Sequence, residues 1–123
     1  NNLNYAVCIR KAAGYCSITY TNIQNGTTYP FQIRNVDDAG QPTVPPGQAG
    51  AEIFSCPDDY IVINGIRLCG DRLNDGSVIQ DFTRNAPVTD SSAGPIIVPV
   101  RTDGRVTGRG FRLFYTQNRC PNT

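Results

Sequence analysis

The chain has 123 residues, a net charge of +1 and no histidine. One domain is expected for this length, and the small charge argues against general binding to nucleic acid or acidic membranes. No apolar run is long enough for a membrane span, and the lack of histidine removes the commonest general base. Five cysteines indicate an oxidising, extracellular setting, and a start at Asn1 without a signal peptide suits a mature protein or a fragment.

A hairpin is expected at the start of the chain, with strands over residues 4–10 and 15–21. Alternation gives each strand one apolar set, and these sets are Tyr5, Val7 and Ile9, and Cys16, Ile18 and Tyr20. If both sets share the inner side, Ile9 faces Cys16, and Cys8 lies on the other face. A slip of one residue would instead place Cys8 opposite Cys16, so both arrangements stay open.

A polar loop is expected over residues 22–29, then a short strand over 30–36 and a second loop over 37–51. The first loop contains Asn25-Gly26-Thr27, which makes Asn25 an acceptor for N-glycosylation. The strand should bury Phe31, Ile33 and Val36. The second loop is rich in proline and glycine and is expected to contain no strand.

Two cysteines bracket the clearest hairpin of the sequence, in residues 56–70. The segment 60–63 is rich in β-branched and aromatic residues, and Asn64-Gly65 tolerates the positive φ angles of a two-residue turn. Cys56 and Cys69 therefore stand near the open ends of a loop that a disulfide would close, with a stabilisation of about 3 kcal/mol in the chain-entropy model. The alternative is a pair of buried free thiols.

The remaining chain predicts a polar segment over residues 71–92, a strand over 95–102, a turn over 103–108 and a last strand over 110–117. Because Pro99 cannot donate a ladder hydrogen bond, its strand is expected at a sheet edge or with Pro99 at a bulge. The expected core residues are Ile79 and Phe82 in the polar segment, Ile96, Val98 and Val100 in the first strand, and Phe111, Leu113 and Tyr115 in the last.

Short strands separated by turns, without helical periodicity, predict an all-β sandwich. The order of motifs across roughly residues 5–120 resembles a CUB domain. The resemblance rests on Cys56-x-x-Asp59-Tyr60 with the following strand and Cys69-Gly70, and on the ending, in which Thr102-Asp103 precedes Gly110-Phe111-x-x-x-Tyr115. The opening, Asn4 to Arg10 with Gly14-Tyr15-Cys16, is similar to arthropod members of that family.

This resemblance implies one antiparallel, jelly-roll-like sandwich over residues 1–123. It implies a secreted, non-catalytic module that recognises a protein or a glycan through its loops. CUB domains usually begin with a cysteine well before the position that matches Cys8. We therefore expect the first strands to be missing from this chain and one edge of the sandwich to be open.

The apolar alternation also suggests a second disulfide. Cys16 is expected on the inner face, away from Cys8, and Cys120 follows a last strand that can lie beside the first hairpin. A Cys16–Cys120 bond would close a loop of about a hundred residues and stabilise the fold by roughly 4–5 kcal/mol in the entropy model. Cys8 is then left for an upstream segment or an intermolecular bond.

Many CUB domains bind one calcium ion through a glutamate and two aspartates, and the aspartate positions match Asp59 and Asp103. Asp59 begins one strand and Asp103 ends another, so antiparallel neighbours would bring both carboxylates to one point. Calcium prefers such hard oxygen ligands. Ala51 stands where the glutamate is expected, so Glu52 is the adjacent candidate. Asp37 or Asp38 could take the place of the glutamate. In the alternative arrangement, Arg101 or Arg105 pairs with Asp59 in place of calcium.

Arginines near the end of the chain form a candidate cationic patch for acidic partners, with Arg105 and Arg109 as its expected binding residues. The alternative is that these are ordinary solvated positions. A second function is a structural component of an extracellular matrix or fibre that self-associates through Cys8 or an open edge. An enzyme that uses paired carboxylates is disfavoured, because the chain has neither histidine nor a nucleophile motif.

Overall fold

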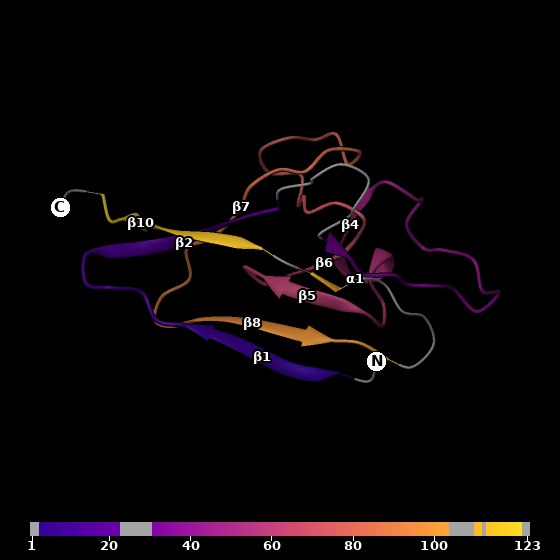
Figure 1. Cartoon of the computed structure of the whole chain (residues 1–123), viewed down its shortest axis with the longest axis horizontal. Helices are drawn as coiled ribbons and strands as arrows, with labels where there is room; N and C mark the ends of the chain where they lie inside the picture. Colours follow the sequence, from indigo (N-terminus) through magenta and orange to yellow (C-terminus); the bar gives the residue numbers. More distant parts are fainter. Residues whose placement is uncertain (1–2, 23–30, 104–109, 112, 122–123) are drawn as a thin grey trace.

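Two antiparallel sheets face each other in the computed structural model (Figure 1), which describes residues 3–22, 31–103, 110–111 and 113–121. Nearly all regular structure in these residues is β-strand, as expected from the sequence. The elements are β1 (Asn4–Ile9), β2 (Tyr15–Thr21), β3 (Phe31–Gln32), β4 (Ala49–Ala51), α1 (Glu52–Ser55), β5 (Tyr60–Ile63), β6 (Ile66–Gly70), β7 (Val88–Asp90), β8 (Ile96–Arg101), β9 (Gly110–Phe111) and β10 (Phe114–Arg119).

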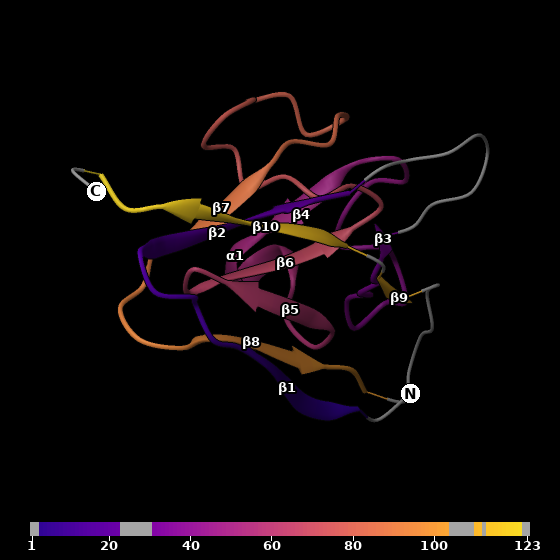
Figure 2. The same ribbon diagram turned by 60° about the vertical axis from the view of Figure 1, so that its left-hand side comes forward.

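The larger sheet has the strand order β1-β8-β5-β6-β4, and the smaller one has the order β10-β2-β7. The short strands β3 and β9 pair with each other. The turned view in Figure 2 shows β2 and β10 crossing over the sheet that contains β5 and β8. Both sheets contribute to one apolar core, whose fully buried members include Ile18, Val88, Ile61, Leu68 and Ile96.

The prediction that the first two strands pair as a hairpin is wrong. β1 pairs with β8, whereas β2 pairs with β10 and β7, so the chain crosses from one sheet to the other between them. The connection is held by Gln117 of β10, whose side-chain oxygen accepts a hydrogen bond of 2.7 Å from the backbone N–H of Ala12. Local alternation predicts which residues share a face, but it carries no information about which strand lies alongside.

β1 is the edge strand of the larger sheet, and its apolar side chains are poorly covered. Tyr5 lies opposite Val100 and Val7 opposite Val98, so each pair shares the inner face. Val98 and Val100 are buried, but Tyr5 and Val7 remain 45% and 37% exposed. The apolar side chains of β1 therefore share one face of the strand as predicted, but they are less buried than expected.

Pro99 lies in a strand with neighbours on both sides, which corrects the expectation of an edge or a bulge. β8 pairs with β1 over its whole length, but its pairing with β5 includes only Arg101 and Val100. The ladder towards β5 stops before Pro99, which has no N–H to donate. The proline is accommodated because this second ladder is short.

The 56–70 hairpin forms as β5 and β6 around Asn64 and Gly65, whose φ angles are 55° and 77°. β6 also pairs with β4, a strand that falls inside the segment expected to be a loop. Close backbone approach explains this pairing, because a Cβ added to Gly70 would lie 2.4 Å from the carbonyl oxygen of Gln48. Small residues in a glycine-rich segment here permit a strand that turn propensity alone does not predict.

The segment 71–92 also differs from the expectation. It contains β7 and buries Leu73 and Val88, whereas Phe82 remains 37% exposed and Ile79 is half-buried. Between these residues, Asp81 stabilises a local turn by accepting hydrogen bonds from the backbone and side chain of Thr83. No helix in the described part of the chain is long and apolar enough to cross a membrane.

The last expected strand is divided between two sheets. β9 pairs with β3 and β10 pairs with β2, so residues 110–117 do not form one continuous strand. Phe111 and Leu113 pack partly against the core, but Tyr115 is 55% exposed although it lies opposite the buried Tyr20. β10 is an edge strand, so its inner face is covered less well than that of β2.

Candidate functional site

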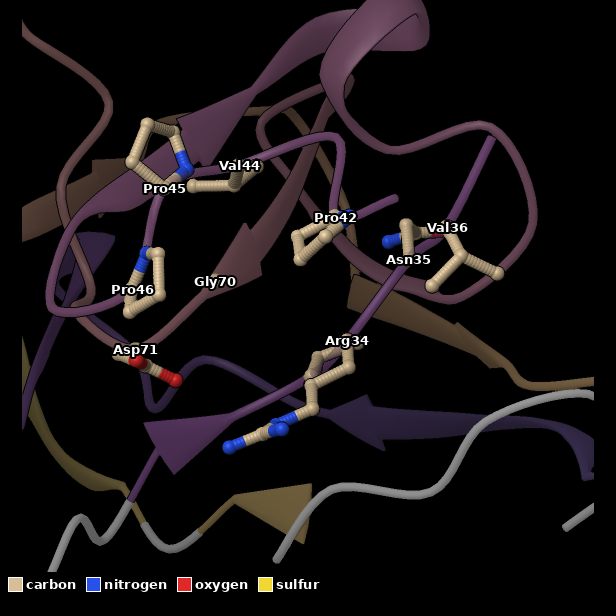
Figure 3. A pocket seen from close by; sticks show the side chains of 10 residues that line it. Arg34, Asn35, Val36, Pro42, Val44, Pro45, Pro46, Gly70 and Asp71 are labelled. Carbon is tan, nitrogen blue, oxygen red and sulfur yellow. The ribbon is translucent and has the colours of Figure 1, made fainter. Parts of the chain in front are cut away.

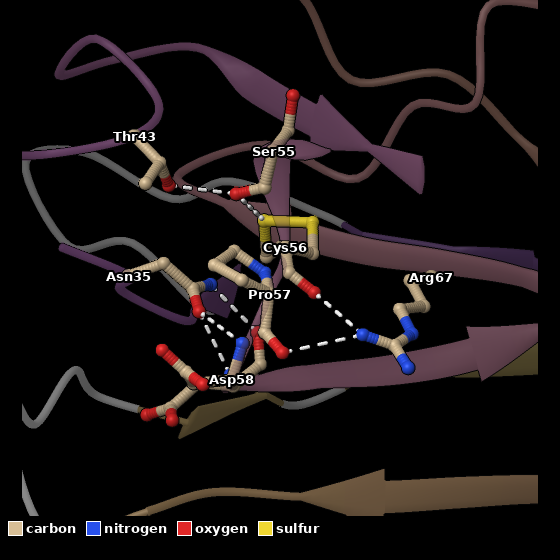
Figure 4. The surroundings of a disulfide bond; sticks show 9 residues. Asn35, Thr43, Ser55, Cys56, Pro57, Asp58 and Arg67 are labelled. Carbon is tan, nitrogen blue, oxygen red and sulfur yellow. Dashed lines mark hydrogen bonds between the residues drawn. A yellow bond between two sulfur atoms is a disulfide. The ribbon is translucent and has the colours of Figure 1, made fainter. Parts of the chain in front are cut away.

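The loop before β5 is fixed by a disulfide and by an arginine (Figure 4). Cys56 bonds to Cys69 of β6, and both cysteines are fully buried. Arg67 of β6 donates to the backbone oxygens of Cys56 and Pro57, at 3.3 and 3.2 Å. Its guanidinium also lies 4.1 Å from the ring centroid of Tyr60. These contacts attach the loop to the hairpin and so fix where the following aspartates stand.

Asn35 holds the same loop from the other side. Its side-chain oxygen accepts hydrogen bonds from the backbone N–H groups of Asp58 and Asp59, at 3.0 and 2.8 Å. Its side-chain nitrogen donates to the backbone oxygen of Asp59 at 2.7 Å. Asn35 is buried, so these bonds are shielded from competing water. The role of Asn35 was not predicted, because an asparagine in a loop carries no signal that it bonds to a segment more than 20 positions away.

Asp59 and Asp103 are brought together at one end of the sandwich, where β5 begins and β8 ends (Figure 1). The backbone N–H of Asp103 donates to a carboxylate oxygen of Asp59 at 2.9 Å. Asp59 is only 3% exposed, and burial raises its pKa from 3.8 to about 6. The Asp103 carboxylate raises this pKa further, while the Asp103 N–H lowers it. The site therefore brings two carboxylates together, and the Asp59 carboxylate is buried.

The aspartate pair suits a calcium ion in its chemistry, since carboxylate oxygens are preferred calcium ligands. Glu52 is not part of the pair: it begins α1, is exposed and has a φ of 73°. Among the described residues, no three acidic or cysteine side chains gather as a metal-binding group. Within the described residues, further ligands would be neutral oxygens, such as backbone carbonyls, side-chain amides or water.

The cysteines leave one thiol unpaired. Cys16 at the start of β2 bonds to Cys120 after β10, and Cys8 on the edge strand β1 is free and exposed. A Cys8–Cys16 bond across a hairpin does not form, because these strands belong to different sheets. Cys16 is exposed rather than on a buried inner face, since it lies at the end of its strand.

Three of the expected site residues lie outside the described residues, namely Asn25, Arg105 and Arg109. The glycosylation site and this cationic patch therefore stay predictions. Of the other candidates for the calcium site, Asp37 is used locally, because its carboxylate accepts hydrogen bonds from the backbone of Ala39 and Gln41.

A small hollow lies between the proline-rich loop and β6 (Figure 3). Its walls include Pro42, Pro45 and Pro46, with Arg34 and Asp71 on the opposite side. The Asp71 carboxylate already accepts hydrogen bonds from the backbone of Gly47 and the side chain of Gln32. The cavity volume is about 100 Å³. Sites for small-molecule ligands usually exceed about 300 Å³, so this hollow is too small for such a ligand.

The family model of the animal CUB domain matches residues 1–118. This range covers nearly the whole chain, including the Cys56–Cys69 loop and the Asp59–Asp103 pair. No curated protein and no solved structure matches the chain. The likeness of the opening segment to arthropod sequences therefore stays a prediction.

Proposed function

This chain belongs to the CUB domain family, whose members are in general extracellular binding modules, and we propose that it recognises a protein or glycan in a calcium-dependent way. Asp59 and Asp103 hold the ion, and the segment that follows Asp103 meets the partner. The module is non-catalytic, in keeping with its family and with the absence of histidine.

One observation supports this proposal most directly: the buried Asp59 carboxylate lies against Asp103, and burial together with the Asp103 carboxylate raises its pKa. Two like charges at this separation repel unless a cation or a proton is added. The pKa of about 6 means that Asp59 is largely ionised at extracellular pH. A calcium ion would relieve the repulsion between the two carboxylates and join β5 to the end of β8.

The surrounding residues would keep this site in place before any ion binds. Asn35 is hydrogen-bonded to both the backbone N–H and the backbone oxygen of Asp59, and the Cys56–Cys69 bond fixes the loop that precedes this residue. Asp59 is therefore presented in one position, which lowers the ordering cost of binding. Because Asp103 follows β8 directly, its ligation would couple the ion to the end of that strand.

The test is calcium titration of chelator-treated protein by calorimetry, together with thermal unfolding at millimolar calcium. We expect measurable heat and a rise in melting temperature, because an ion that binds only the folded state stabilises it. Asp59→Asn and Asp103→Asn should remove both effects. Asp81→Asn is the matched control, since Asp81 is an exposed carboxylate that accepts hydrogen bonds from Thr83 in the segment before β7, and its substitution should leave the response unchanged.

An absence of heat together with an unchanged melting temperature at millimolar calcium would end the calcium proposal. Partner recognition is tested separately, by measuring capture of extracellular proteins and glycans with and without chelator. Equal capture in both conditions would leave a binding module that does not depend on calcium.

The exposed thiol of Cys8 favours a second candidate, a structural component that self-associates. Cys8 lies on β1, whose outer edge has no strand beside it among the described residues. A disulfide between two copies would join such edges. Size-exclusion chromatography under oxidising and reducing conditions distinguishes the candidates, because only the structural component should form a species that reduction dissociates. Cys8→Ser should abolish that species.

A further inference from the structure

The end of the sandwich opposite the aspartate pair carries a wide hollow at the connection between β1 and β2. In both views this connection lies beside the start of β8, away from the end where β8 leaves the sheet (Figures 1 and 2). The hollow has a volume of about 430 Å³. This volume lies within the range of about 300–1,000 Å³ that ligand sites usually occupy. Its lining consists of Arg10, Lys11, Ala12, Ala13, Gly14, Tyr15, Gly94 and Pro95.

The charged side chains that line this hollow are all cations. Arg10 is exposed and forms no hydrogen bond or ion pair with any described residue. Lys11, the chain's single lysine, donates to the backbone oxygens of Cys16 and Ser92, so its ammonium is fixed by neutral carbonyls rather than by a carboxylate. An ammonium group has three donors, and one remains for a ligand.

A third cation adjoins the hollow. The Arg119 guanidinium lies 5.8 Å from the ring centroid of Tyr15, and Tyr15 is one of the residues that line the hollow. The nearest acidic residue along the chain from Ser92 is Asp90, which is buried and accepts hydrogen bonds from Ser92 and Asn64. The electrostatic potential in the hollow is therefore positive, which favours an anionic ligand.

The hollow is also held in shape by contacts on both sides. The backbone N–H of Tyr15 donates to the Ala12 oxygen at 3.0 Å, which closes the turn. The N–H of Cys120 donates to the Gly14 oxygen at 2.9 Å, next to the Cys16–Cys120 disulfide. This turn is joined to the end of β10, so the cations are displayed from a constrained backbone.

We propose that this hollow binds the sulfate and carboxylate groups of a sulfated glycan. Arginine forms planar, paired hydrogen bonds with such anions, and Arg10 has its donors available. Protein partners commonly place an anchoring aromatic or arginine side chain in a well-packed pocket. Here the lining between the cations is alanine, glycine and proline, which gives a shallow floor without such a pocket. Tyr15 offers the one aromatic surface in the lining against which a sugar ring can pack.

The experiment measures binding of a heparin hexasaccharide by calorimetry at low salt, in the presence of chelator so that the calcium proposal is not involved. Arg10→Gln and Arg119→Gln should each weaken binding by about tenfold, the size expected for loss of a charge-assisted hydrogen bond. The double variant Arg34→Gln/Arg84→Gln is the control, because it removes two positive charges, one more than either single variant, from exposed arginines elsewhere. Its affinity should stay within about twofold of wild type.

Arg10 makes no described side-chain contact, so its variant should fold, and Arg10→Glu provides a stronger version of the same test. A desulfated hexasaccharide should bind far more weakly. The proposal is overturned by wild-type binding of both Arg10 variants, by loss of binding only in Arg105→Gln/Arg109→Gln, or by no binding of the sulfated probe at low salt. Equal affinity for an oligoglutamate peptide would assign the hollow to acidic proteins and also overturn it.

Discussion

Replacing Asp59 with asparagine should change how stability depends on pH. In the unfolded chain this carboxyl group ionises near 3.8, whereas in the fold burial against Asp103 raises its pKa to about 6. Between these values the folded state binds more protons than the unfolded state. The free energy of unfolding of the calcium-free protein should therefore fall as pH rises from about 4 to about 6, and this contribution should be constant above that range.

The magnitude follows from the same two values. The difference between 3.8 and about 6 corresponds to roughly 3 kcal/mol at about 1.36 kcal/mol per pH unit. That figure is an upper limit, because Asp103 is only partly buried and water near it screens the charge, and we expect about 1–2 kcal/mol. The asparagine of the Asp59→Asn variant would retain a side-chain oxygen to accept the hydrogen bond from Asp103, so the substitution removes mainly the charge.

Urea unfolding between pH 4 and pH 8, with chelator present, measures the effect. The Asp59→Asn protein should lose the decline between pH 4 and pH 6 and be more stable than wild type at pH 7.5. Asp38→Asn, which alters an exposed carboxylate, should keep the wild-type profile. A wild-type profile that rises or stays level through this window would refute the reasoning, and so would an Asp59→Asn profile with the decline intact.

Two further substitutions test the parts of the fold that support the site. Asn35→Ala removes three hydrogen bonds to the Asp58–Asp59 backbone and should lower the free energy of unfolding by about 3 kcal/mol, as judged by urea unfolding; a loss under about 1 kcal/mol would contradict the role given to Asn35. Gly70→Ala places a Cβ against the Gln48 oxygen and should cost at least about 2 kcal/mol more than Gly40→Ala, whose added Cβ meets nothing within 4 Å. Both glycines have positive φ, so equal losses would show that close approach does not matter.

Local patterns in the sequence predicted the parts of the fold that local physics determines. The turn at Asn64-Gly65 and the alternation through Ile96 and Val98 specify β5, β6 and β8, because each signal lies within the element it describes. The all-β class could be predicted for the same reason, because assigning it does not require the order of the strands.

Strand partners and covered faces were less predictable. The first two strands read as a hairpin because they are adjacent in sequence, yet β2 pairs with a strand almost 100 residues away. Tyr5 and Tyr115 follow the apolar alternation but are half exposed, because each lies on an edge strand. Such burial depends on which strand lies opposite, and the residues of one strand do not encode this.

The candidate site shows the same division. The Cys-x-x-Asp motif located Asp59, and the strand directions predicted that Asp103 would lie beside it. Asn35 gave no sign of its role, because its three hydrogen bonds exist only after distant segments have come together. The hollow around Arg10 and Lys11 was missed for a related reason, since Gly94 and Pro95 complete it from a remote part of the chain.

The pairing of β2 with β10 has a consequence for biosynthesis. The smaller sheet cannot be completed until the final strand has been made, about 100 residues after Cys16. At roughly 5–20 residues per second, the Cys16 thiol waits for several seconds without its partner. Cys8 is exposed, only eight positions away and present from the start, so it competes for Cys16 during this interval. Correct maturation therefore requires an environment in which an early Cys8–Cys16 bond is reshuffled once Cys120 emerges.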